Sequence, residues 1–295
     1  MPHYHKLGSI PHKRHTQFRK PDGSLYSEQL FSTEGFSSDS SLLYHSHPPT
    51  QIISTDEPDS VGPEVAEQRM LKHRSFEGFN IKPEDDYLRS RKPVLVNNDV
   101  HVSLAAPKKN MHDYFYKNAD ADEVIFIHEG SGKLKTQYGE LNFAYGDYLV
   151  IPRGTIYQIE FEKEENRLFI VESFSPVRYP KKYLSNYGQL LENSPYCERD
   201  IRVPENLQTL DEKGDFLLSQ CQLHLRAGWN TVPGLALEFP SVGVLGALYA
   251  VCTPCAPLLE EERRAGGSAL ASDAFYPFHF HRARLRAGFA ADDQM

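Results

Sequence analysis

Short apolar runs separated by turn residues dominate the middle of the chain. Residues 124–127 are β-branched or aromatic, and the run is too short for a helix, so it predicts a buried strand. Glycine-containing turn signals follow this run at hairpin spacing. Further strands are expected within residues 93–106, 148–151, 156–161 and 168–174. Short strands at this spacing predict a small antiparallel barrel or jelly roll.

The pattern before the barrel is weaker. Residues 42–44 and 51–54 are strand candidates, and on one strand His45 and His47 would share a face. We interpret these two imidazoles as hydrogen-bonding groups near a barrel opening or an interface. Residues 63–75 predict a surface helix, since proline and acidic residues begin the segment and basic residues end it.

A glycine–proline motif identifies the type of barrel. Gly146, Pro152 and Gly154 have the spacing of the second cupin motif, and Glu123 and Gly130 fit the second half of the first motif. The segment therefore resembles the cupin family. The resemblance implies a mainly β fold, with a double-stranded β-helix (jelly-roll) barrel at residues 91–178.

The metal-binding positions of this motif pair hold other residues. The second-motif His position is Tyr157 and its Asn position is Phe161. Depending on the gap counted, the first-motif His positions fall on Tyr116 and Asn118 or on Lys117 and Ala119. A phenol, an amide or an ammonium group cannot replace neutral imidazoles at a divalent transition metal. We therefore expect a barrel that has lost its metal site.

Composition narrows the class of protein. The chain has 295 residues, enough for about two domains, and its net charge of −8 argues against a general nucleic-acid surface. No apolar run reaches transmembrane length, and no apolar segment of a secretory signal follows the first basic residues. The four cysteines do not form a disulfide framework at this size, which predicts reduced thiols and a cytoplasmic protein.

The segments outside the barrel differ in character. Residues 1–90 form an N-terminal arm and subunit-contact segment, whose first 24 residues are basic and contain His3, His5, His12 and His15. We interpret this start as an intersubunit contact, with metal capture as the alternative. Residues 179–217 read as an extended linker with one short helical turn. Residues 218–295 are an atypical tail: the chain has 15 lysines up to residue 213 and none afterwards.

The arm, the barrel and the linker together carry a second resemblance. The segments MPHYHKLGSIPHKRHTQFRKPDGS, NADADEVIFIHEGSGKLKTQYGELNFAYGDYLVIPRGTIYQIEF and SNYGQLLENSPYCERDIRVPENL occur in this order, and residues 1–217 resemble the N-terminal half of a bacterial homogentisate 1,2-dioxygenase. The resemblance implies a bicupin whose first barrel is structural. It also implies a second barrel with Fe(II) held by two His and one Glu, a site that leaves positions open for substrate and oxygen.

The same resemblance implies a function. Family members open the ring of homogentisate with O2 to give maleylacetoacetate, a step of tyrosine and phenylalanine breakdown, and they assemble as trimers or hexamers. No His followed by Glu six positions later occurs after residue 217, so we carry no ligand over and expect impaired activity in this chain. A reading-frame slip in the gene is the leading explanation for the tail.

The tail offers candidates of its own. His279 and His281 would share one face of a strand and, with a glutamate among residues 260–262, could mimic a two-His-one-carboxylate iron site. Cys252 and Cys255 form a CTPC pair, but a zinc site would need a second ligand pair. We interpret the HxH pair as chance and the CTPC pair as no metal site.

Two other functions compete with the dioxygenase. One is a non-catalytic cupin module that acts as a scaffold or binds a partner protein. The other is a sugar isomerase or epimerase, with Tyr116 and Tyr157 as acid–base candidates but without the usual general-base His.

Overall fold

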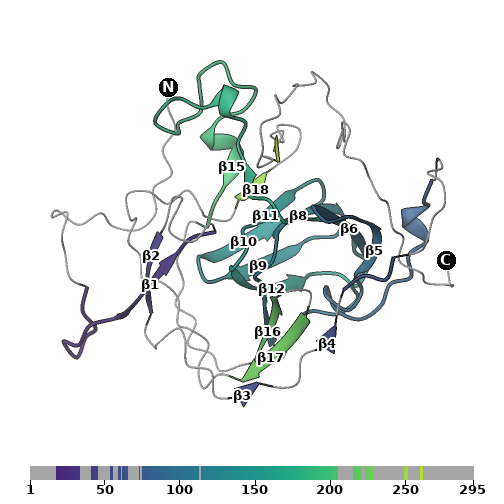
Figure 1. Ribbon diagram of the computed structural model, residues 1–295, viewed down its shortest axis with the longest axis horizontal. Coiled ribbons are helices and arrows are strands. Elements are labelled where there is room, and N and C mark those ends of the chain that lie inside the picture. The colour runs from purple at the N-terminus through teal and green to yellow at the C-terminus, as the bar shows by residue number, and fades with distance from the viewer. Residues whose placement is uncertain are drawn as a thin grey trace.

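The computed structural model describes residues 18–33, 41–45, 54–55, 59–60, 62–65, 73, 75–112, 114–204, 215–220, 223–228, 249–251 and 260–261. Two sheets lie at its centre (Figure 1). Side chains from both sheets form one hydrophobic cluster between them. The fold is mainly β and is a cupin barrel, as the sequence predicts.

The first sheet has the strand order β10-β9-β12-β7-β16-β17-β3, with β4 also paired to β17. All of its pairings are antiparallel except that of β7 with β16, which is parallel. The strands are β3 (Ser54–Thr55), β4 (Asp59–Ser60), β7 (Tyr114–Asn118), β9 (Gly132–Thr136), β10 (Gly139–Phe143), β12 (Ile156–Phe161), β16 (Asp215–Gln220) and β17 (Leu223–Gly228).

The second sheet has the strand order β15-β18-β11-β8-β13-β6-β5, and its strands are all antiparallel. They are β5 (Lys92–Val96), β6 (Val100–Ala105), β8 (Asp122–Glu129), β11 (Tyr148–Ile151), β13 (Arg167–Ser173), β15 (Ile201–Arg202) and β18 (Tyr249–Val251).

Smaller elements surround the barrel. Two further strand pairs are antiparallel, and the three short helices in the described residues are all 3-10 turns. These elements are β1 (Ser27–Phe31) with β2 (Ser41–His45), β14 (Val177–Arg178) with β19 (Glu260–Glu261), and η1 (Gly78–Asn80), η2 (Lys181–Tyr183) and η3 (Glu198–Asp200). None of the helices described is long and apolar enough to cross a membrane.

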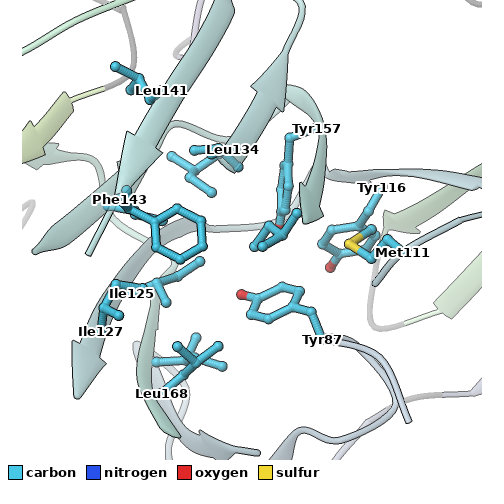
Figure 2. Packing of buried hydrophobic residues seen from close by; sticks show 14 of the residues in the cluster. Tyr87, Met111, Tyr116, Ile125, Ile127, Leu134, Leu141, Phe143, Tyr157 and Leu168 are labelled. Carbon is cyan, nitrogen blue, oxygen red and sulfur yellow. The ribbon is translucent and has the colours of Figure 1, made fainter. Parts of the chain in front are cut away.

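Alternation along each strand builds two apolar layers. On β8, Ile125 and Ile127 point into the barrel, whereas Val124 points to the other face of the sheet. The inner cluster joins both sheets, and Figure 2 shows residues from it. The outer cluster is mostly valine, from the sheet that contains β8. β-Branched residues suit such a sheet because they pack well on a pleated surface.

The motif glycines lie where the backbone needs them. Gly130, Gly146 and Gly154 have φ values of +111°, +89° and +81°, a region that favours glycine. At Gly130 a Cβ would also lie 2.1 Å from the Asn166 side-chain oxygen. The spacing of the glycines in the cupin motif therefore reflects the turns that join the strands of the barrel.

The structure confirms most of the predicted strands and corrects two other expectations. Residues 62–65 are not helical, and most of the predicted helix over 63–75 lies outside the described residues. The linker contains two helical turns rather than one, and it returns to the barrel. β15 lies at the edge of the second sheet, and Arg202 in β15 donates hydrogen bonds to Asp147 and to the carbonyl oxygen of Asn142 in β10 of the first sheet. The domain boundaries and the cytoplasmic location stay predictions.

Candidate functional site: a buried charged cluster inside the barrel

The structure settles which residues occupy the first-motif positions. Tyr116 and Asn118 are buried inside the barrel, with exposed fractions of 1% and 3%, whereas Lys117 between them is half-buried. Tyr116 lies directly opposite Tyr157 of β12, and their rings meet edge to face with centroids 5.4 Å apart. The correct gap is therefore the one that places Tyr116 and Asn118, not Lys117 and Ala119, at the former ligand positions.

Glu123 is the one acidic residue of the motif that the chain keeps. Its side chain is fully buried, and the Tyr157 hydroxyl donates a 2.5 Å hydrogen bond to one of its oxygens. On the neighbouring strands, Glu172 lies directly opposite Glu123, and His101 lies directly opposite Glu172. Directly paired residues share a face of a sheet, so the three side chains form a polar row across β8, β13 and β6.

A cation that no motif marks completes the site. Arg91, just before β5, places one terminal nitrogen 2.8 Å from Glu123 and the other 2.8 Å from Glu172. Its guanidinium group lies over the Tyr87 ring, 5.4 Å from the centroid. The remaining Glu172 oxygen accepts a 2.9 Å hydrogen bond from the Asn118 amide. We call this set the Arg91 cluster: Tyr87, Arg91, Tyr116, Asn118, Glu123, Tyr157 and Glu172.

Sequence reasoning missed Arg91 for a simple reason. It precedes an apolar strand at a position where arginine is usually solvent-exposed, and only the fold brings it to Glu123, 32 positions along the chain. The available signal was Glu123 itself. A glutamate in the middle of a buried strand requires a charged or hydrogen-bonding partner.

Burial and charge set the protonation states in the cluster. Burial raises the pKa of Glu123, and the neighbouring Arg91 opposes this shift. Burial lowers the pKa of Arg91, but Glu172, Tyr87 and Glu123 together hold it well above its ordinary value. Burial and the Glu123 charge raise the pKa of Tyr157 well above its usual range. Tyr157 is therefore a neutral hydrogen-bond donor whose hydroxyl is bound to Glu123.

The cluster does not fit the metal that the cupin fold implies. The two carboxylates already bind a guanidinium group, and a divalent ion beside Arg91 would meet a like charge. The neutral motif positions supply a phenol or an amide where a transition metal would require imidazole. Among the described residues, no three His, Cys, Asp or Glu side chains are grouped so that they could hold a metal ion.

The other sequence candidates do not join the Arg91 cluster. His45 is buried in the β1–β2 hairpin, where its ring lies 2.8 Å from the Gln29 side-chain oxygen. His47, the four arm histidines, Cys221, Cys252, Cys255, Glu262, His279 and His281 lie outside the described residues. Glu260 and Glu261 form β19, which pairs with β14. Cys197 is a free, half-buried thiol.

Comparison with known proteins places the barrel in a family context. Residues 87–217 match the family model described as "Homogentisate 1,2-dioxygenase N-terminal". The protein named "Putative dioxygenase SSO1533" of Saccharolobus solfataricus is 38% identical over 215 residues, which are 73% of this chain and 55% of that protein. The chain thus spans about half the length of this curated relative. The resemblance expected from the sequence is confirmed, and it concerns the N-terminal half only.

Solved structures similar to part of the chain include cupins. A cupin-2 domain protein of Shewanella frigidimarina covers 28% of this chain and 79% of its own, with 25% identity and a TM-score of 0.26. KdgF from Halomonas sp. covers 28% of this chain and 76% of its own, with 14% identity and a TM-score of 0.25.

Proposed function

We propose, from the match of residues 87–217 to the N-terminal part of homogentisate 1,2-dioxygenases, that this chain supplies the structural barrel of a cupin-type dioxygenase. In this proposal the enzyme opens the aromatic ring of homogentisate with O2, and Fe(II) belongs to a second barrel. The chain's own barrel supplies a rigid scaffold and takes no part in the chemistry. The named relative, described as a dioxygenase, supports the reaction class.

One observation carries the scaffold role. The guanidinium of Arg91 binds Glu123, the only acidic motif residue kept, and the Tyr157 hydroxyl occupies that carboxylate's other oxygen. A carboxylate with both oxygens bound inside a packed core is not available to a metal or a substrate. The barrel interior therefore provides stability and shape, and no step of ring opening is assigned to its residues.

The first experiment tests whether this chain is itself active. The purified full-length chain is supplied with Fe(II) without air, its bound iron is measured by elemental analysis, and O2 uptake is followed after addition of homogentisate. We expect substoichiometric iron and no uptake. Stoichiometric iron together with homogentisate-dependent uptake would contradict the scaffold role and would show a complete enzyme.

A chimera tests the proposed substrate. Residues 1–217 of this chain are joined to the second barrel of an active homogentisate 1,2-dioxygenase, and O2 uptake is measured with homogentisate. We expect activity, because a matching scaffold positions the second barrel without contributing ligands. A soluble, iron-loaded and inactive chimera would argue against homogentisate as the substrate of this scaffold.

We propose further that the chain forms a homo-oligomer, a trimer or a pair of trimers, as the resemblance implies. Exposed aromatic residues support a protein contact: Phe79 and Tyr145 are 59% and 73% exposed, and both rings lie against His128. Light scattering coupled to size-exclusion chromatography measures the mass, and a monomer at micromolar concentration would contradict this assembly.

A further inference from the structure

In the Arg91 cluster two carboxylates surround a cation, and this cation is the side chain of Arg91 itself. Glu123 is fully buried, and the side chains of Arg91 and Glu172 are only 10% and 19% exposed. One guanidinium group reaches both carboxylates at 2.8 Å, each through a different terminal nitrogen. The two acids cannot separate to reduce their mutual repulsion, since they lie opposite each other on paired strands. Together they favour a bound positive charge, with a proton shared by the pair as the other way to relieve their repulsion.

The neutral groups of the cluster fit the same arrangement. The Tyr157 hydroxyl binds the second oxygen of Glu123, and the Asn118 amide binds the second oxygen of Glu172. Each carboxylate thus has one oxygen for the cation and one for a neutral donor. The Tyr87 ring covers the face of the guanidinium. The site therefore matches a flat cation that faces both carboxylates at once, a shape that arginine has and a metal ion lacks. One terminal nitrogen of Arg91 donates a hydrogen bond to Glu123, whereas its contact with Glu172 is an ion pair without hydrogen-bond geometry.

We propose that Arg91 is the resident cation of this barrel, and that the site it leaves when truncated binds a planar organic cation of the guanidinium class in preference to a divalent metal. Glu123 stands where the first cupin motif has its glutamate. At this position the guanidinium group of Arg91 pairs with both Glu123 and Glu172. This proposal concerns the barrel alone and is independent of the reaction assigned to the second barrel.

Chemical rescue tests the proposal on the full-length chain. In Arg91→Ala we expect the melting temperature to fall by roughly 10 °C, since the loss of one partner leaves buried charge uncompensated. Millimolar ethylguanidinium should restore part of this loss in the variant and leave the wild-type protein unchanged. Sodium chloride at equal ionic strength and Mn2+ serve as the comparison cations. The matched control is Arg89→Ala, which removes an arginine that also lies over a tyrosine ring but is 63% exposed.

A second variant keeps the test decisive if Arg91→Ala does not fold. Combining Arg91→Met with Glu123→Gln and Glu172→Gln removes all three charges, so this protein should fold without any added cation. Its melting temperature should not respond to ethylguanidinium. The proposal is overturned if Arg91→Ala melts no lower than Arg89→Ala, if sodium chloride rescues equally, if Mn2+ stabilises more than ethylguanidinium, or if the triple variant also requires a cation.

Discussion

The interior of the barrel is filled in two different ways along one strand. On β8, Ile125 and Ile127 join a cluster of aliphatic and aromatic side chains, whereas Glu123, two residues earlier on the same face, lies among charges and hydroxyl groups. Figure 2 shows the apolar side chains of the interior: Leu141 and Phe143 lie on one side of the view, and Tyr157 lies on the other with Tyr87 and Tyr116, the three tyrosines that also belong to the Arg91 cluster.

The two regions contribute to stability in different ways. Each fully buried aliphatic side chain gains about 1.5–3 kcal/mol from leaving water. The Arg91 cluster first has to recover the cost of dehydrating three charged groups, so its net contribution is small while it is intact. Removing one charged member of the cluster should destabilise the protein strongly, because the remaining charges stay buried. Single substitutions should therefore harm the charged region at least as much as the aliphatic region.

Glu123→Leu is the substitution expected to reduce stability most, and it tests the difference between the two regions directly. This change leaves Arg91 with one of its two carboxylates and removes the acceptor of the Tyr157 hydroxyl. We expect a loss of about 4 kcal/mol in the free energy of unfolding, measured with urea. The control is Glu140→Gln, whose ion pair with Lys133 lies at the surface and should be worth at most about 1 kcal/mol. Equal losses in the two variants would remove the distinction between the regions.

The second-largest loss of stability is expected when a side chain of the aliphatic region is truncated. Leu134 is fully buried in the inner cluster, so Leu134→Ala leaves a cavity between the two sheets. We expect a loss of about 3 kcal/mol in urea unfolding. This substitution leaves no buried charge uncompensated, so added ethylguanidinium should not change the stability of this variant. A loss well above that of Glu123→Leu would show that the aliphatic region is the more sensitive of the two.

The same contrast explains what the sequence could predict. Short apolar runs and the motif glycines predict the barrel, because strand alternation and positive φ leave local traces. The absence of imidazoles at Tyr116, Asn118 and Tyr157 is equally local. Arg91 and Glu172 lie 32 and 49 positions from Glu123, respectively, so only strand register brings them together. A charge that is neutralised across the fold leaves no pattern in a single sequence.

The linker shows a second limit of sequence reasoning. Its prolines and charged residues predict an extended surface connector, yet Tyr196 and Ile201 are buried and Arg202 binds the barrel. Arg202 is one of the charged residues that suggested exposure, and it pairs with Asp147 in the turn before β11. Polar composition therefore does not predict exposure where a charged pair anchors the segment.

Tyr157→Phe tests the charged region by removing a single oxygen atom. The change removes the hydroxyl that donates to Glu123 and keeps the ring that contacts Tyr116. We expect a loss of about 2 kcal/mol in urea unfolding, since a buried carboxylate loses one of its two donors. Tyr145→Phe is the matched control, because its ring is 73% exposed and its loss should lie near zero. An unchanged stability in Tyr157→Phe would mean that Arg91 alone satisfies Glu123.

The smallest expected effect lies at the end of the polar row, where His101 is partly buried beside Glu172. Burial lowers the pKa of His101 below 6.5, Glu172 and the Asn97 backbone oppose the shift, and Arg91 adds to it. The folded protein therefore resists protonation more than the unfolded chain does. The contribution of the neutral ring is complete above pH 6.5 and is lost as the pH falls toward the folded value.

The measurement is the difference in unfolding free energy between the wild-type protein and His101→Gln from about pH 8 to about pH 5. This difference should shift against the wild-type protein at low pH by less than about 1 kcal/mol, since solvent screens the partly exposed ring. The exposed His112, replaced by glutamine, serves as the control for the loss of an imidazole. A difference that stays constant with pH would mean that Glu172 compensates the ring fully, and the polar row would then be neutralised along its whole length rather than only around Arg91.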